Sequence, residues 1–285
     1  MTDETLEQRA EQIVNYNFSN RLSAEEHRLA IEITKEIYLS PEELPFDIWH
    51  EHVSQFDQQL QTRLSQAETP EQRAVLRFAS LLLQSVAEDA ATSIFSNRQQ
   101  SLAYLEQGLK HAEAFLSDGE TTSGVRERVL LLYVNAVGTL EQLGQVDKAV
   151  ETAQRGLKHA EAFLSDGETT SGVRELVLSL YFNAGVTLGQ LGQPNEELDT
   201  YQRGLKHAEA FLSDGETTSG VREQVLQLYV NAVGTLEQLG QVDKAVETAQ
   251  RGLKHAEAFL SDGETTSGVR EQVLQLYVNA AMPLS

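Results

Sequence analysis

The sequence predicts an all-α fold: a right-handed α-solenoid of antiparallel helix pairs with an N-terminal helical cap. The first observation is the string GLKHAEAFLSDGETTSGVRE, which occurs four times without a change. The copies begin at Gly108, Gly156, Gly204 and Gly252, so the period is constant at 48. The second is that apolar residues recur at helical spacing within each period. A fixed period of this size is typical of arrays whose units bury their apolar faces only against neighbouring units.

Residues 1–69 share no period with the rest of the chain. A first helix is expected over residues 2–20. A second begins at residues 23–26, where Ser-Ala-Glu-Glu forms a capping box, and ends near Leu39. This N-terminal region most simply serves as a helical cap on the array. A separate recognition or effector-coupling module is the alternative.

Pro41 or Pro45 is expected to open a third helix, because proline suits the first helical position. Residues 69–71, Thr-Pro-Glu, start a fourth helix, which resembles the first helix of a degraded repeat. Residues 97–116 then form its partner helix. The third helix carries one apolar face, made of Phe46, Trp49, Val53, Phe56, Leu60 and Leu64.

The first full period predicts two helices, a tight turn and a longer polar loop. Residues 125–143 place apolar side chains on one broad helical stripe. That helix should end near Gly144, since glycine suits a left-handed C-terminal position. A second helix follows from about residue 146. The polar loop after it is expected to be a solvated connector, with Thr170 or Ser171 capping the next helix.

The array is therefore predicted to occupy residues 70–285. Its parts are a degenerate repeat (70–121), full repeats (122–169, 170–217 and 218–265) and a lone terminal helix (266–285). Pro283 breaks the last helix before a partner helix arrives. Either this helix caps the array, or it leaves an apolar face open to head-to-tail self-association, for which Met282 and Leu284 are the candidate residues.

The repeated unit resembles the tetratricopeptide repeat (TPR). Residues 181–192 read YFNAGVTLGQLG and residues 145–150 read QVDKAV. In that family an aromatic residue, an Asn and a Gly precede Leu-Gly at the turn, and Asp-x-Ala opens the second helix. Gly156 and Leu157 match the later pair of a small residue and a leucine. The resemblance covers the chain from about residue 70 and implies a TPR-like superhelix.

The sequence also departs from that family. The period of 48 is longer than the 34 that is usual there, and the usual closing proline is missing. Val137 and Val233 stand where the family has the glycine that only Gly185 keeps. Glu197 replaces the small residue kept at Ala245. Helix contacts in the second full repeat are therefore expected to differ from those of its neighbours.

The resemblance implies a concave groove lined by one face of each first helix. An Asn on that face binds the backbone of an extended peptide in the family, and Asn135, Asn183, Asn231 and Asn279 match its position. Because an Asn side chain both donates and accepts, it pairs with a peptide unit without reading its sequence. Solvated polar residues are the alternative interpretation. The other residues predicted on or beside this face are Leu131, Ser179, Gln227, Val134, Phe182, Val230, Glu141, Glu237, Gln142, Gln190 and Gln238.

The family's carboxylate clamp, built from Lys and Arg beside the Asn, is not expected here. Glu141 and Glu237 stand where the groove would continue, so a C-terminal carboxylate should be repelled. A basic or neutral extended segment, or an amphipathic helix, fits such a groove better.

Composition excludes several classes of function. The net charge of -21 disfavours nucleic acid and anionic lipid, whose phosphates require Lys and Arg. The chain has no apolar run long enough to span a bilayer, and its acidic start lacks the features of a signal peptide. With no cysteine, disulfides and thiolate chemistry are excluded. These features favour an acidic cytoplasmic protein whose charge serves solubility.

No cofactor, metal site or catalytic motif is expected. His111, His159, His207 and His255 recur once per period, too far apart to share a metal, and are predicted to lie on helix surfaces. Phosphate-binding, zinc-protease and hydrolase motifs are all missing. The chain is therefore predicted not to be an enzyme.

The sequence favours a non-catalytic protein–protein interaction scaffold, which binds a peptide segment or helix of a partner in the concave groove. Two alternatives remain open. One is a structural protein that self-associates head-to-tail into a homo-oligomer through the truncated last repeat. The other is the sensor module of a bacterial signalling or defence system.

Overall fold

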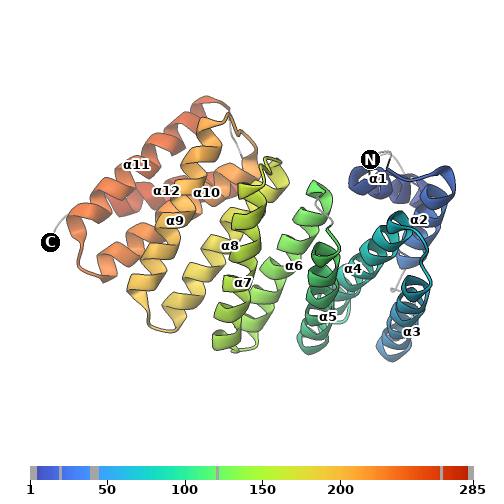
Figure 1. The fold of residues 1–285 in the computed structure, drawn as a ribbon. Helices are drawn as coiled ribbons and strands as arrows, with labels where there is room; N and C mark the ends of the chain where they lie inside the picture. The colour runs from blue at the N-terminus through green and yellow to red at the C-terminus, as the bar shows by residue number, and fades with distance from the viewer. Residues whose placement is uncertain (1–4, 19–20, 39–44, 120–121, 264–265, 282–285) are drawn as a thin grey trace. The chain divides into compact units, whose positions relative to one another are not determined.

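The computed structural model describes residues 5–18, 21–38, 45–119, 122–263 and 266–281 (Figure 1). These residues form twelve α-helices and contain no strand. The chain divides into two compact units, residues 1–139 and 140–285. The all-α fold class is confirmed. The predicted division into a cap (1–69) and an array (70–285) separates non-repeated from repeated helices. It differs in kind from the two compact units and stays a prediction.

Unit 1 contains five complete helices and most of a sixth. Helix α1 packs on α2, and α4 contacts α2, α3 and α5. The apolar face predicted for α3 is buried at Trp49, Val53, Phe56 and Leu60. The helices are α1 (Leu6–Phe18), α2 (Ala24–Ile37), α3 (Phe46–Ser65), α4 (Pro70–Ser93), α5 (Arg98–Ser117) and α6 (Ser123–Gln142).

Helix starts in unit 1 follow the predicted capping chemistry. Ser23 and Glu26 form the reciprocal capping box of α2, and Thr69 forms a second one at α4. Pro45 immediately precedes α3, whereas Pro41 lies outside the described residues. Such caps satisfy backbone N–H groups that the first turn leaves without a partner, so they fix where each helix begins.

From α6 onward the helices start at a constant interval, and α7 to α12 belong to unit 2. The starts of α6, α8, α10 and α12 are evenly spaced along the chain, and those of α7, α9 and α11 share the same spacing. In each pair we call the first helix A and the second helix B. Helix α10 contacts α8, α9, α11 and α12. The helices are α7 (Val146–Ser165), α8 (Ser171–Gln190), α9 (Pro194–Ser213), α10 (Ser219–Gln238), α11 (Val242–Ser261) and α12 (Ser267–Ala281).

The tight turn between helices A and B closes on a glycine, as predicted. Gly192 has φ of 71° and Gly240 has φ of 70°, a left-handed conformation that costs other residues about 1 kcal/mol. The amide of Gln241 donates to the carbonyl of Leu236 at 2.8 Å, and that of Gly240 donates to Glu237 at 2.9 Å. These two bonds form a Schellman cap, which satisfies the last carbonyls of helix A.

The loop after helix B is exposed at most of its residues, as predicted for a solvated connector, but its glutamate is buried. Glu216 is only 8% exposed. Its carboxylate accepts from the amides of Thr217 and Thr218 at 3.0 and 2.9 Å, and from the Ser171 hydroxyl at 2.7 Å. Thr170 and Thr218 are the N-cap residues, as predicted for Thr170, but neither forms a side-chain capping bond. The glutamate instead supplies negative charge at the helix start.

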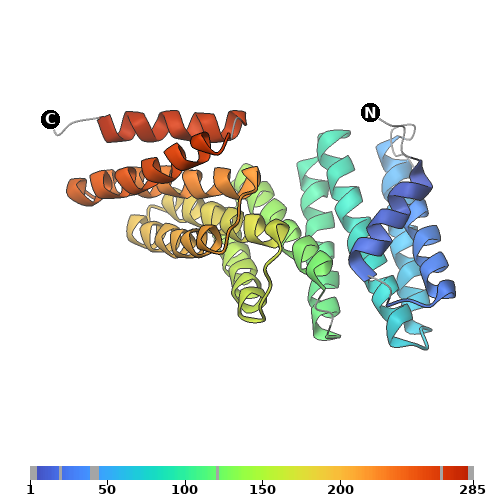
Figure 2. The same ribbon diagram turned by 90° about the horizontal axis from the view of Figure 1, so that it is seen from above.

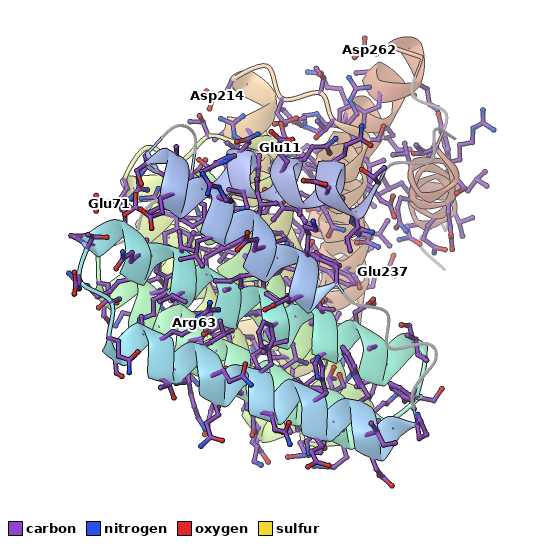
Figure 3. The ribbon with its side chains drawn as sticks, turned by 90° about the vertical axis from the view of Figure 1, so that its right-hand side faces the viewer. Glu11, Arg63, Glu71, Asp214, Glu237 and Asp262 are labelled. Carbon is purple, nitrogen blue, oxygen red and sulfur yellow. The ribbon has the colours of Figure 1, made fainter. Side chains whose placement is uncertain are left out.

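Each loop also binds the preceding helix A. Arg174 is 6% exposed, donates to Asp214 at 3.0 Å and lies over the Phe211 ring at 4.9 Å. The arrangement recurs in the next repeat, where Arg222 donates to Asp262 at 2.8 Å. Figure 3 labels both aspartates, which stand at the same end of the helices of unit 2. The constant loop therefore joins the end of helix B to the start of helix A in the same repeat.

Two histidines of the constant string, His207 and His255, pack against tyrosines, and the prediction of a helix-surface position is wrong for His111, which is buried. His207 stacks on Tyr181 with 5.5 Å between ring centres, and His255 lies 5.7 Å from Tyr229. Burial lowers the pKa of His255. His111 in unit 1 is 6% exposed and lies 3.2 Å from Asp57. These imidazoles are parts of helix interfaces.

The second full repeat packs differently from its neighbour, as predicted. Gly185 lies so close to Tyr201 that a Cβ atom there would overlap three ring carbons. The equivalent residues of the next repeat are Val233 and Ala249, both buried. In one repeat a large helix B residue thus faces the smallest possible helix A residue. In the next repeat the sizes are exchanged.

Candidate functional site

None of the predicted partner-binding residues is buried, although helix A has buried positions on its other face. Exposed are Gln142, Gln190, Glu237 and Gln238. Half-buried are Leu131, Val134, Asn135, Glu141, Ser179, Phe182, Asn183, Gln227, Val230, Asn231 and Asn279. Met282 and Leu284 lie outside the described residues. The structure therefore places the predicted residues on the open side of helix A, and their role in binding stays a prediction.

Unit 1 brings two predicted residues together in a cavity of about 410 Å³, the size of a small ligand site. Leu131 and Asn135 of α6 line it. Residues of α4, Arg9 of α1 and Tyr38 also line it. The remaining lining residues are Ser85, Val86, Glu88, Asp89, Ala90, Ile94 and Arg128.

A buried carboxyl group stands beside Asn135 in this cavity. Glu88 is 8% exposed and accepts from the Asn135 amide at 3.2 Å and from the Ser101 hydroxyl at 3.1 Å. Thr92 donates to it at 3.2 Å. Burial raises the pKa of Glu88, and these hydrogen bonds oppose the rise. The Asn135 side chain keeps a carbonyl oxygen and a second N–H for other partners.

Two arginines line the cavity together with the acidic residues Glu88 and Asp89. Arg9 lies over the Tyr38 ring at 4.9 Å, and Arg128 makes a long contact of 3.5 Å with the Ser85 hydroxyl. Neither guanidinium has a carboxylate partner within the described part of the chain. In a protein with a net charge of -21, two such arginines beside one cavity are a specific feature.

The sequence prediction missed this feature. It expected no Lys or Arg beside the repeated Asn, and Arg128 corrects that expectation for Asn135. The signal was present: position 128 is Arg in the first copy, whereas the later copies have Leu176, Gln224 and Gln272. Arg9 could not be placed from the sequence, because it lies in a helix outside the repeats.

In unit 2 the predicted residues include two glutamates and no basic residue, and some of them bond other residues of the same unit. The Asn231 amide donates to the Gln227 carbonyl of its own helix at 2.9 Å. The Thr187 hydroxyl bonds Glu141 at 2.7 Å, so this predicted site residue braces two successive A helices. Burial raises the pKa of Glu141. Glu237, its counterpart two repeats further along the chain, is exposed.

The second full repeat supplies the same brace from its other helix. The Thr235 hydroxyl bonds Glu197 of α9 at 2.9 Å. Gly189 stands where the other repeats have Glu141 and Glu237, and a Cβ atom there would lie 2.8 Å from the Glu197 carboxylate. The departure seen in the sequence at Glu197 therefore relocates a carboxylate and keeps its bond to the next helix A.

Two further findings bear on function. Among the described residues, no group of three or more His, Asp or Glu side chains is placed to hold a metal ion. In the same residues, no helix combines the length and apolar character needed to cross a membrane. A second cavity of about 250 Å³ in unit 2 lies between α9, α10 and α11 and includes none of the predicted residues.

Comparison with known proteins gives weak similarity to solved structures. No protein-family model matches the sequence, and no curated protein matches it. Among solved structures the chain is similar to Rap protein, solved in complex with Competence and Sporulation Factor. The TM-score is 0.45 and the identity 14%, over 94% of this chain and 80% of that one. Function is therefore argued from the residues of the chain itself.

Proposed function

We propose that this chain is a non-catalytic protein-interaction protein that binds an extended peptide segment of a partner along the open face of its A helices. The observation that carries this proposal is the unit 1 cavity, which combines Arg9 and Arg128 with Asn135. An extended peptide needs a hydrogen-bond partner for its backbone amides, space for a side chain and a specific contact that fixes its register. Asn135, the apolar wall at Leu131 and the two arginines supply these three requirements.

The cavity also defines the chemistry of the segment. A carboxylate is the natural partner of a guanidinium that has no acidic partner in the described residues. The unit 2 face offers Ser179, Gln227 and Asn231, which are neutral and suit polar or amide groups. The segment proposed for the unit 1 cavity therefore carries one acidic group, which revises the expectation of a basic or neutral partner, and the unit 2 face suits neutral groups.

A random heptapeptide library displayed on phage, selected on the full chain, tests this proposal. Peptides selected by the wild type are expected to be enriched in acidic residues. Charge-assisted hydrogen bonds contribute about 1.5–3 kcal/mol, so Arg128→Gln should weaken the selected peptides by roughly 10- to 100-fold. Glutamine is the residue that two later copies carry there, and it is compatible with the helix.

Arg63→Gln is the matched control, because Arg63 is exposed on α3 and does not line the cavity. Selected peptides should bind this variant as they bind the wild type. Asn135→Ala should also weaken binding, and Asn183→Ala and Asn231→Ala should weaken any peptide long enough to reach them. Peptides that bind Arg128→Gln and the three Asn variants with wild-type affinity would place the site elsewhere and refute the proposal.

A further inference from the structure

Helix α12 carries an apolar face that nothing covers among the described residues. Leu274 is 67% exposed, Tyr277 44% and Val278 53%. Figure 2 shows α12 as the outermost helix of unit 2, with α11 and α10 on its other side. Exposed clusters of large apolar side chains are typical of interaction sites.

The repeats show what belongs on this face. Leu226 and Tyr229 of α10 occupy the positions equivalent to Leu274 and Tyr277, and both are fully buried. Helix α11 contacts α10, and Gly252 lies against Tyr229, where an added Cβ atom would come within 3.0 Å of the tyrosine Cβ. Only a residue without a side chain allows the two helices to approach this closely.

Polar groups fix the register of the covering helix. Arg251 of α11 bonds the carboxylate of Glu209, which also accepts from the Tyr229 hydroxyl at 2.7 Å. His255 packs on the Tyr229 ring. At the far end, Asp262 pairs with Arg222 of α10. The covering helix therefore presents Arg, Gly, His and Asp at positions i, i+1, i+4 and i+11.

The same groups recur one repeat earlier, on α8. Arg203 of α9 lies 3.3 Å from the Tyr181 hydroxyl and 3.4 Å from Glu161. Gly204 lies against Tyr181, and His207 stacks on its ring. Two independent copies of this interface thus agree on the side chains that cover a helix A.

Helix α12 presents the receiving half of this interface, and no described residue supplies the covering half. The Tyr277 hydroxyl bonds Glu257 at 3.3 Å, as its counterparts do in the other repeats. Arg270, the counterpart of Arg222, is exposed and has no acidic partner in the described residues. The covering helices of the other repeats contact a carboxylate, a tyrosine and an arginine. On and beside α12 the equivalent groups are Glu257, Tyr277 and Arg270.

We infer that α12 is a docking site for an amphipathic helix of a partner protein that carries Arg-Gly, a His three residues after the Gly, and an Asp seven residues after that His. The Gly would lie on Tyr277, the Arg and His at Glu257, and the Asp at Arg270. This interface continues the packing of the repeats, and it does not depend on the proposed groove.

A peptide with the sequence of residues 242–263, labelled at its N-terminus and titrated with the full chain, tests this inference by fluorescence anisotropy. The peptide should bind saturably. Changing its Arg251→Glu or its Gly252→Leu should weaken binding by about tenfold or more, since each removes a contact seen twice. Lys254→Gln, which changes an exposed residue, is the matched control and should leave the affinity unchanged.

Isolated helices of this length are marginal in water, so the same peptide is also fused to the chain through a flexible Gly-Ser linker, which raises its effective concentration. The fusion should raise the unfolding midpoint, and Leu274→Glu in α12 should abolish both this rise and peptide binding. Arg128→Gln should change neither.

Equal midpoints for the fused and unfused chains, together with equal binding of the parent and Arg251→Glu peptides, would overturn the inference. A concentration-dependent dimer of the chain that Leu274→Glu dissolves, without peptide binding, would assign the face to a second copy and would overturn it as well.

Discussion

In one repeat Gly185 packs on Tyr201, and in the next the equivalent residues are Val233 and Ala249. This difference in side-chain size allows a quantitative prediction about core packing. Replacing Gly185 with Val would place a branched side chain where even a Cβ atom overlaps the Tyr201 ring. Replacing Tyr201 with Ala would instead leave a cavity in a fully buried position. The double substitution Gly185→Val with Tyr201→Ala recreates the pair that the chain already uses at Val233 and Ala249.

The magnitudes follow from the two kinds of packing error. Overpacking costs about 1–3 kcal/mol, and the better helix propensity of Val offsets roughly 0.4 kcal/mol of it, so Gly185→Val should cost about 2 kcal/mol. Tyr201→Ala should cost about 4 kcal/mol, within the range for aromatic truncation. The added Val partly fills the space that the ring leaves. The double variant should therefore lose only about 2–3 kcal/mol, a coupling of about 3 kcal/mol.

Urea unfolding followed by circular dichroism measures the four free energies of the cycle. Gly234→Val is the control, because an added Cβ atom there meets nothing within 4 Å and the second repeat already has Val186 at this position. It should change the free energy of unfolding by less than about 0.5 kcal/mol. Losses in the two single variants that simply add up in the double variant would refute the packing argument.

Two further predictions concern charged side chains. Arg222→Ala should lower the free energy of unfolding by roughly 1.5–3 kcal/mol, since it removes a nearly buried partner of Asp262. Arg270→Ala, at the exposed equivalent position, should lower the free energy of unfolding by less than about 0.5 kcal/mol. Equal losses for Arg222→Ala and Arg270→Ala in urea unfolding would show that the bond to Asp262 does not stabilise the fold. Burial raises the folded-state pKa of Glu88 above its unfolded value. Its ionisation therefore lowers stability as the pH rises from the unfolded pKa through the folded one. The free energy of unfolding of Glu88→Gln relative to wild type should be higher at pH 8 than at pH 4, and a pH-independent difference would show that Glu88 titrates normally.

Local sequence chemistry predicted the helices well. The start of α2 at Ser23, the start of α4 at Thr69 and the turn at Gly144 all depend on bonds within a few residues, which a sequence displays directly. The period and the helix pairs followed from spacing alone. The difference between repeats was also foreseen at Glu197, because it replaces a small residue with a charged one.

Contacts between residues far apart in the sequence could not be predicted by the same reasoning. The bond between Arg174 and Asp214 joins the start of α8 to the end of α9, and nothing in either local sequence selects the other. The cavity at Asn135 was missed for a related reason. Its walls come from α1, α4 and α6, and two of these lie outside the repeated string, so the period gave no information about them.

The interfaces explain why one string is constant while its surroundings vary. Within it, Gly204 allows the close approach of helices, His207 covers a tyrosine, and Asp214 and Glu216 fix the neighbouring helix A. A change of any of these residues in one copy would disturb the helix contacts made by that copy. Arg128 and its counterparts differ between copies and lie outside the constant string, whereas the differences at Gly185 and Glu197 change the packing of their own repeat.

This separation has a consequence for binding. Because the junctions are made by the constant string, the open face can change from repeat to repeat without altering how the helices stack. Arg128 in α6 and Gln224 in α10 are compatible with the same helix geometry. Within unit 2 a ligand would meet Leu176 on α8 and Gln224 on α10, so the differences between copies fix its orientation. Arg128→Gln combined with Gln224→Arg should therefore weaken the binding of an acidic group at the unit 1 cavity and favour it on unit 2, while the free energy of unfolding stays within about 0.5 kcal/mol of wild type.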